Sequence, residues 1–441
     1  MNSRKKKTIF HIDVNSAFLS WSAVKKLQDN PESIDLRTVP SAVAGDIESH
    51  RGVITAKSIP AKRYGVQTGE PVVKALAKCP DLKIVKSDFD TYRVFSHQLI
   101  KLLRTYTPTV EQASIDEAYL DMTGTEGVYP PHEDGEEFPL NVANAIRNEV
   151  KNRLGFTVNV GISVNKLLAK MASDFEKPDQ VHTLFPEEVP EKMWSLPIDR
   201  LYGCGETTAA KLRALGVRTI GDAASMEAEV LCAHLGEKNG AYIFNSANGL
   251  SDEPVSTGRE EAKGYSNETT LPKDISEDNY EEEAPRILRA LCGKVASRMR
   301  ADDVYASTIA VSVKTNRFVR YSKQMKLPDS TNTTERVFEI ASLLMKRLLY
   351  GEQGGFSGRF AIRLIGVSAT NLDKGTYRQM SLFDMFDGGN EQGAATGTKA
   401  GTMLSSVRNQ EKSEKLDAMQ DLIRSKHGDG AVKTALELKK P

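Results

Sequence analysis

The chain has 441 residues, of which 39% are hydrophobic and 27% charged, and its 59 basic side chains balance 59 acidic ones. This composition is typical of a soluble globular protein and excludes a membrane-spanning one, because no apolar run approaches the roughly 18 residues that cross a bilayer. The four cysteines lack CxxC spacing, which argues against a zinc site or disulfides and favours a reducing, cytoplasmic location. The basic first residues lead into a strand pattern, so no secretory signal is expected.

Strand and helix patterns alternate through the first 180 residues. An apolar run predicts a strand over 8–13, which ends at Asp13 and leads into a helix over Ala17–Leu27. An acidic hairpin is expected at 110–122, followed by a Pro/Gly-rich surface loop at 125–139. Further strands are expected over 39–43, 52–56 and 157–163, and further helices over 91–106, 141–154 and 165–175. This alternation favours an α+β domain with a mixed or antiparallel sheet.

The second half of the chain divides into four parts. Short helices are expected over Leu201–Gly249, and the polar stretch 251–263 is interpreted as a linker. The tail, 371–441, contains one helical candidate, Lys415–Lys426, and is otherwise expected to be flexible. Residues 264–370 predict a βαβ-type module, with strands at 305–314, 317–326 and 359–368 and helices at 279–300 and 331–350. Within this module, 15 Lys/Arg and 6 Asp/Glu between residues 284 and 370 leave a net charge of +9, which favours an acidic partner such as nucleic acid.

Three carboxylates stand at the ends of predicted strands. Asp13 ends the first strand, and Asp116 and Glu117 interrupt the otherwise apolar pattern of Ala113–Asp121. Burying ionised carboxylates is costly unless positive charge neutralises them, and clustered carboxylates are hard ligands that suit Mg²⁺. A helix cap at Asp13, or pairing of these acids with lysines, is the alternative. Neighbouring strand residues point to opposite faces, so Asp116 and Glu117 converge only if the strand bends between them.

Two further motifs indicate contacts with nucleic acid and with a partner. Gly203-Cys204-Gly205 precedes a helix pattern that ends at Gly216, as in a helix-hairpin-helix element that binds DNA phosphates, although a plain turn between helices is the alternative. Gln379, Leu382 and Phe383 belong to an apolar cluster in a tail that is expected to be flexible, and this cluster resembles the peptide that binds the bacterial sliding clamp.

Two aromatic side chains near Asp13 have competing interpretations. Phe18 either walls off the sugar of a nucleotide or is a core aromatic of the first helix, and periodicity alone favours the core. His11 is interpreted as a strand residue and not as a ligand.

Together the motifs resemble the Y-family, or translesion, DNA polymerases over roughly residues 8–386. The resemblance is carried, in family order, by Asp13-Val14-Asn15, Ser114–Ala118, Val160–Ser163 with Asn165–Lys170, and Lys177-Pro178. It implies a right-hand polymerase with a ferredoxin-like palm, small fingers, a helical thumb with the helix-hairpin-helix, and a little finger. The implied boundaries are palm 8–17 and 88–180, fingers 18–87, thumb 181–250, linker 251–263, little finger 264–370 and a flexible tail 371–441 that carries the clamp peptide.

The resemblance also implies roles for single residues. Asp13, Asp116, Glu117 and the Val14 carbonyl would bind two Mg²⁺ ions, and Asp13, Asp116 and Glu117 would be the catalytic residues. Phe18 would be the sugar gate, Lys177 would contact the triphosphate, and Gly203 and Gly205 would contact DNA. Ile59 and Lys62 stand where many members carry Tyr and Arg, so Lys62 would offer the nucleotide only a point charge. Lys62, together with Asp13-Val14-Asn15 near the start, looks closer to the UmuC-like branch than to the DinB branch.

The function expected from this resemblance is template-directed DNA synthesis during damage bypass and repair. The substrates would be primer-template DNA and deoxynucleoside triphosphates, and the chain would act as a monomer that binds a sliding clamp and can take accessory subunits. One alternative is a catalytically idle adaptor that binds clamp and DNA, and the presence of all three carboxylates favours the enzyme over it. Another is a different palm-type nucleotidyl enzyme such as a nucleotide cyclase, against which the hairpin and the clamp peptide argue.

Overall fold

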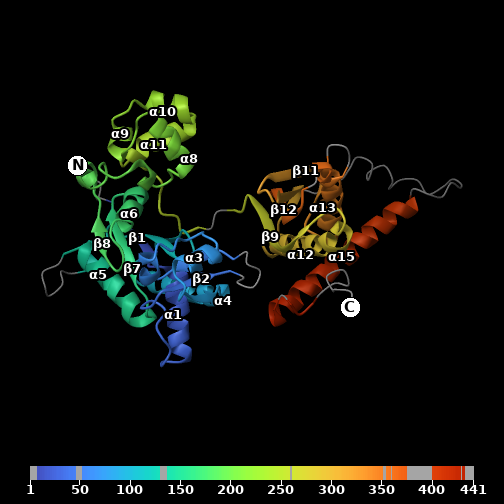
Figure 1. Ribbon diagram of the computed structural model, residues 1–441, viewed down its shortest axis with the longest axis horizontal. Helices are drawn as coiled ribbons and strands as arrows, with labels where there is room; N and C mark the ends of the chain where they lie inside the picture. The colour runs from blue at the N-terminus through green and yellow to red at the C-terminus, as the bar shows by residue number, and fades with distance from the viewer. Residues whose placement is uncertain are drawn as a thin grey trace. The chain divides into compact units, whose positions relative to one another are not determined.

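The computed structural model describes residues 7–45, 52–129, 137–258, 261–350, 354–358, 360–374, 400–428 and 430–432, with side chains of the last helix from Lys412 onward. The chain forms two compact units, Met1–Arg259 and Glu260–Pro441, whose elements are labelled in Figure 1. None of the helices in these ranges combines the length and apolar character needed to cross a membrane.

The first unit is built on a five-stranded sheet. Its strands, in spatial order, are β5 (Val110–Gln112), β6 (Glu117–Asp121), β1 (Ile9–Val14), β7 (Val158–Ser163) and β8 (Val181–Thr183). All neighbours are antiparallel except β7 and β8, which run parallel, so the sheet is mixed as the sequence predicts. Its helices are α4 (Phe89–Leu103), α5 (Leu140–Glu149), which continues into a wider turn over Val150–Leu154, and α6 (Lys166–Ser173).

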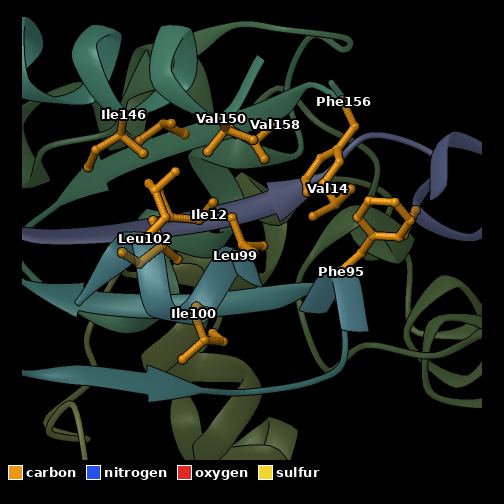
Figure 2. Close-up of a cluster of buried hydrophobic side chains, with 14 of the residues drawn as sticks. Ile12, Val14, Phe95, Leu99, Ile100, Leu102, Ile146, Val150, Phe156 and Val158 are labelled. Carbon is orange, nitrogen blue, oxygen red and sulfur yellow. The ribbon is translucent and has the colours of Figure 1, made fainter. Parts of the chain in front are cut away.

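Strand β1 is buried on both faces of this sheet. Because side chains alternate along a strand, Ile12 and Val14 point into an apolar core that they share with α4, α5 and β7 (Figure 2). His11 and Asp13, which alternate with them, face α6, where His11 contacts Ser173 and Asp13 contacts Lys170. The sheet therefore has an apolar face toward α4 and α5 and a polar face toward α6.

A smaller sheet lies within the residues expected to form the fingers. Strand β2 (Ser41–Ala44) pairs with β3 (Ile54–Lys57) and with β4 (Lys83–Lys86), close to the two strands that the sequence predicts. Strand β4 was not expected, because only two apolar residues separate its terminal lysines. The helices of this part are α1 (Ala17–Asp29), α2 (Ile59–Arg63) and α3 (Val72–Lys78).

The region after β8 is entirely helical among the described residues up to 250, as expected for a thumb. Its helices are α7 (Val189–Lys192), α8 (Glu206–Ala214), α9 (Ile220–Ala224), α10 (Ala228–Leu235) and α11 (Glu237–Ala247), with short 3₁₀ turns at Pro186–Glu188 and Ile198–Arg200. Helices α10 and α11 pack closely at Gly240, where a Cβ atom would stand 2.4 Å from the backbone nitrogen of Cys232. Only glycine fits there.

The second unit pairs a four-stranded antiparallel sheet with two helices. The strands, in spatial order, are β11 (Arg320–Thr331), β10 (Tyr305–Thr315), β12 (Ile362–Asp373) and β9 (Gly264–Ile275), and the helices are α12 (Tyr280–Ala301) and α13 (Thr334–Leu349). Strand β9 was missed because it is largely polar and contains Pro272, a residue that is tolerated at the edge of a sheet.

The last described helix, α15 (Ala400–His427), contains the helix that the sequence predicts over Lys415–Lys426 and begins 15 residues before it, where the tail was expected to be flexible. Asp417 is buried and accepts a hydrogen bond of 2.8 Å from the backbone N–H of Thr334, at the start of α13. The guanidinium of Arg300 lies 3.2 Å from Asp417 and 2.7 Å from Asp421. These contacts fix the helix to its unit, and the apolar periodicity of the tail gave no indication of them because acidic side chains make them.

Candidate active site

The three predicted carboxylates meet at one end of the five-stranded sheet. Asp13 and Glu117 are direct partners in the antiparallel pairing of β1 with β6. Asp116 is the last residue of the turn before β6, and its carbonyl oxygen accepts a hydrogen bond of 3.1 Å from the Val14 N–H. Since Asp116 and Glu117 belong to a turn and to a strand, the alternation of strand side chains does not separate them.

Ser114 holds the turn that carries Asp116. Its Oγ accepts hydrogen bonds from the backbone N–H groups of Asp116 at 3.2 Å and Glu117 at 3.0 Å, and donates to Asp116 Oδ1 at 2.7 Å. A serine side chain that bonds to backbone groups two and three residues later stabilises a tight turn. The local sequence Ser-x-Asp-Glu thus fixes the backbone at both carboxylates.

Two lysines neutralise these acids. The Lys170 ammonium lies 3.0 Å from Asp13 Oδ2 and 2.8 Å from Glu117 Oε1, and its side chain is only 8% exposed. Lys177 lies 3.0 Å from the same Asp13 oxygen. Both lysines also contact Asp174, at 3.2 Å and 2.8 Å respectively. The sequence pointed to Lys177 but not to Lys170 or Asp174, although a lysine inside an apolar helix such as α6 is itself a signal of a buried charge partner.

Burial and charge oppose each other at this cluster. Burial raises the pKa of Asp13 above its ordinary value although Lys170 and Lys177 pull it down. Burial also acts to raise the pKa of Glu117, but its contacts with His11 and Lys170 outweigh that effect and hold the pKa far below the usual range. The pKa of Lys170 is raised well above normal, because Asp13 and Glu117 overcome the opposing effect of burial. Glu117 and Lys170 therefore stay charged at neutral pH.

His11 completes the polar face of β1. Its ring is fully buried, its Nδ1 lies 2.8 Å from Ser173 Oγ, and its Nε2 lies 3.6 Å from Glu117 Oε2. The ring packs against Tyr119 with centroids 4.6 Å apart. Burial lowers the pKa of His11, which favours the neutral ring. His11 is a strand residue, as interpreted from the sequence, but it also supports the carboxylate of Glu117.

An open cleft of about 410 Å³ lies beside these carboxylates. Asp13 and Asp116 line one end, and Lys57, Lys62 and Lys177 add three amines to its wall. Lys57 was not predicted as a site residue, and burial together with repulsion from Lys62 lowers its pKa. A cleft that joins carboxylate oxygens to several amines can bind a divalent cation and a polyphosphate side by side.

Phe18 lies between the cleft and the core. Its ring lines the cleft, but it also stacks on Tyr92 with centroids 4.8 Å apart and contacts Phe89 edge-on at 5.8 Å. The structure thus places Phe18 where both interpretations of its role apply. Ile59 is 48% exposed and lines the same cleft, so the position expected to carry Tyr in many relatives does face it.

Gly203 and Gly205 border a second, larger cleft of about 1100 Å³ that also contains Lys62 and Lys177. Gly203 has φ +81, and a Cβ atom there would lie 2.5 Å from the Tyr242 hydroxyl oxygen. Gly205 is the N-cap residue of α8, so backbone N–H groups of the first helical turn are available beside it. The geometry allows a phosphate to approach this backbone closely.

The donor set suits a hard divalent cation. No group of three His, Cys, Asp or Glu side chains within the described residues has the arrangement of a preformed metal site. Asp13 and Glu117 nevertheless face each other across the Lys170 ammonium, which shows that positive charge is held between them. Asp116 and the Val14 backbone add further oxygen atoms beside Asp13. Oxygen ligands of this kind fit Mg²⁺.

Two expected features lie outside the described residues. They are the clamp peptide with Gln379, Leu382 and Phe383, and residues 130–136 of the acidic loop.

Comparisons with known proteins show which families and proteins this chain resembles. The impB/mucB/samB family model matches residues 12–174, the model of its C-terminal domain matches 262–382, and the model of the DNA polymerase-iota thumb domain matches 199–251. DNA polymerase IV of Clostridium acetobutylicum is 39% identical over 98% of this chain and 99% of that protein. DNA polymerase IV 1 of Bacillus subtilis is 32% identical over 99% of this chain and 94% of that protein.

A solved structure, a Y-family DNA polymerase chimera of Dbh and Dpo4, has the same fold. It is 25% identical in sequence, gives a TM-score of 0.68, and the match covers 82% of this chain and 98% of that one. The expected right-hand polymerase architecture, with its helical thumb, is therefore confirmed. The chain belongs to the impB/mucB/samB family, that is, to the Y-family DNA polymerases.

Proposed function

We propose that the cleft beside Asp13 is the nucleotidyl-transfer site of this chain, which is a DNA-directed DNA polymerase of translesion type. The observation that carries the proposal is the pairing of Asp13 with Glu117 around the Lys170 ammonium. An idle adaptor would need no such cluster, so this alternative is not favoured.

Asp13, Asp116, Glu117 and the Val14 carbonyl are the proposed ligands of two Mg²⁺ ions. Such a pair lowers the pKa of a primer 3′-hydroxyl and neutralises charge on the leaving pyrophosphate. The ammonium groups of Lys170 and Lys177 both donate hydrogen bonds to Asp13 Oδ2. At least one of these hydrogen bonds would have to break before that oxygen could bind a cation. Lys170 and Lys177 are therefore the counter-ions that Mg²⁺ would replace at Asp13.

Lys177, Lys62 and Phe18 are the proposed nucleotide contacts. The two amines line the same cleft as Asp13 and would bind phosphate oxygens, while the Phe18 ring would exclude a 2′-hydroxyl. Lys62 can act only as a point charge, in contrast to a bidentate arginine. The proposed likeness to the UmuC-like branch rests on Lys62 and on Asp13-Val14-Asn15, whereas the two relatives from Clostridium acetobutylicum and Bacillus subtilis are named DNA polymerase IV.

Primer-template DNA is the proposed partner of the thumb and of the second unit. The N–H groups at the start of α8, beside Gly203 and Gly205, would contact phosphates. In the second unit, Lys314 and Arg320 are register partners on neighbouring strands. Val313, the residue before Lys314 on β10, is buried in the core that the helices cover. Because neighbouring strand residues point to opposite faces, Lys314 and its partner Arg320 lie on the face away from α12 and α13. The net charge of +9 between residues 284 and 370 favours DNA through counterion release.

Other expectations remain proposals. The division of the first unit into palm, fingers and thumb follows the residue boundaries given above. Binding of Gln379, Leu382 and Phe383 to a sliding clamp, action as a monomer with accessory subunits, and a cytoplasmic location are proposed on the sequence alone.

Primer extension with the purified full-length chain tests the proposal. With Mg²⁺ and a primed template, the wild type should add deoxynucleotides in the order that the template dictates, and Asp116→Ala should lose about 10²–10³-fold in rate. Asp90→Asn removes a carboxylate that pairs only with its exposed neighbour Arg93, so it serves as the matched control. Absence of extension by the wild type, or equal extension by Asp116→Ala, would show that the assignment is wrong.

A further inference from the structure

Asp174 lies next to the proposed metal ligands without being one of them. It is the C-cap residue of α6, and its two carboxylate oxygens contact different lysines. Its Oδ2 lies 3.2 Å from the Lys170 ammonium, and its Oδ1 lies 2.8 Å from the Lys177 ammonium. One side chain therefore contacts both cations of the site.

These contacts form part of a closed ring of alternating charges. Asp13 Oδ2 contacts the same two ammonium groups, each at 3.0 Å. Asp13 and Asp174 thus share Lys170 and Lys177 as counter-ions. When Asp13 and Glu117 bind a cation, Asp174 is the carboxylate of the ring that stays available to both lysines.

The requirements of helix α6 do not explain an aspartate at this position. A negative charge at the C-terminus of a helix is unfavourable, because the carbonyl groups there carry partial negative charge. The side chain at position 174 is 45% exposed, so it contributes little to the core. Its two lysine contacts are the remaining physical reason for a carboxylate there.

We propose that Asp174 is a positioning residue that retains Lys170 and Lys177 at the site while Asp13 and Glu117 take up the divalent cations. This inference rests on the proposed function of the cleft. Without the Asp174 charge, Lys170 keeps its contacts with Asp13 and Glu117, and Lys177 keeps the one with Asp13, so a cation must displace more strongly held amines. Lys177 also loses the partner that keeps it beside the cleft once Asp13 is occupied. Cation affinity and nucleotide affinity should therefore fall together.

The test compares Asp174→Asn with the wild-type full-length chain. Mn²⁺ serves as the probe, and its free concentration is measured by electron paramagnetic resonance in the presence of a dideoxy-terminated primer-template and the next deoxynucleotide. Because Asp174 is partly exposed, we expect the apparent Kd for Mn²⁺ to rise about three- to tenfold. In steady-state extension, the KM for the nucleotide should rise by a similar factor, while kcat at saturating Mg²⁺ and nucleotide changes less than about twofold.

Three variants complete the design. Asp174→Glu keeps the charge and should recover most of both affinities, which a purely structural role of residue 174 would not produce. Asp174→Ser is a second neutral variant and should show the same losses, so the test holds even if the Asn variant does not fold. Asp90→Asn removes an exposed carboxylate on α4 and should match the wild type.

The outcomes separate this inference from the proposed function. Unchanged Mn²⁺ affinity and KM in the neutral variants would overturn the role of Asp174 while leaving the polymerase assignment intact. Equal defects in the Glu and neutral variants would also overturn it, because charge would then be irrelevant. A wild-type chain that extends no primer would instead contradict the proposed function.

Discussion

The two faces of strand β1 differ in the kind of side chain that they carry. Ile12 and Val14 belong to an apolar core against α4 and α5 (Figure 2). His11 and Asp13 instead face the lysine-bearing helix α6. Burial of each apolar side chain contributes about 1.5–3 kcal/mol. Burial of the charged ones costs free energy unless they are paired. On this strand, Ile12 and Val14 therefore contribute to stability, whereas Asp13 and His11 belong to the proposed active site.

The charges on the polar face are paired within the chain. Lys170 and Lys177 supply the positive charge that Asp13 and Glu117 require in the folded chain. A one-residue slip of β1 would exchange the two faces and bury Asp13 among apolar side chains, so the same pattern also fixes the register. Substitutions on each face should therefore change catalysis and stability separately.

The largest expected effect is on the charged face. Lys170→Met should lower the free energy of unfolding by about 3–5 kcal/mol, because Asp13 and Glu117 lose the amine between them. Mg²⁺ should restore part of this loss, since it can take the place of the missing charge. Urea denaturation with and without Mg²⁺ measures both quantities. If Mg²⁺ stabilises the variant no more than the wild type, the carboxylates are not its binding site.

A core substitution on the opposite face gives the contrast. Leu99→Ala, on α4, should cost about 2–5 kcal/mol through loss of burial and creation of a cavity. Mg²⁺ should not recover this loss, and kcat of the folded variant should stay close to that of the wild type. The same denaturation series provides the measurement, and recovery of Leu99→Ala by Mg²⁺ would contradict the separation of the two faces.

These contrasts also show what the sequence can and cannot predict. An apolar run that ends in Asp13, and an acidic pair in an otherwise apolar stretch, suffice to predict the first strand and the three carboxylates. The meeting of these carboxylates depends on the pairing of β1 with β6, which no local pattern encodes. The turn at Ser114 resolves the question of the bend, because Asp116 precedes the strand instead of lying within it.

Contacts made by charged side chains were the hardest features to predict. Lys170 and Asp174 reach the site from α6 and its C-cap, 157 and 161 residues after Asp13, and their spacing has no special signature. Asp417 and Asp421 similarly fix α15 through Arg300, although the sequence indicates only a helix there and not its partner. Strand β9 lacks apolar alternation because it lies at a sheet edge. Tertiary partners decide these features.

Phe18 lies where the two faces meet the cleft, and its substitution should have a smaller effect. Phe18→Leu keeps an apolar side chain against Tyr92 and should cost only about 1 kcal/mol of stability. Removal of the ring should reduce discrimination against ribonucleotides by about 10- to 200-fold. The ratio of kcat/KM for a deoxynucleotide and its ribonucleotide measures this change, and an unchanged ratio would leave Phe18 as a core aromatic only.

The smallest effect on the folded units is expected from the tail. Because the sequence predicts a flexible segment there, replacing Leu382 and Phe383 together with Ala should leave the unfolding free energy within about 0.5 kcal/mol of the wild type. Extension in the presence of a sliding clamp should fall to the rate that the same variant shows without it. Persistent stimulation by the clamp would mean that another segment binds it.

The most direct test compares two adjacent residues on opposite faces of β1. Asp13→Asn and Ile12→Val are each assayed for Mg²⁺-dependent primer extension and for urea stability. We predict that Asp13→Asn loses about 10²–10³-fold in extension rate, whereas Ile12→Val keeps the wild-type rate and loses only about 0.5–1.5 kcal/mol of stability. Wild-type extension by folded Asp13→Asn, or loss of extension by folded Ile12→Val, would contradict the assignment of chemistry to one face and stability to the other.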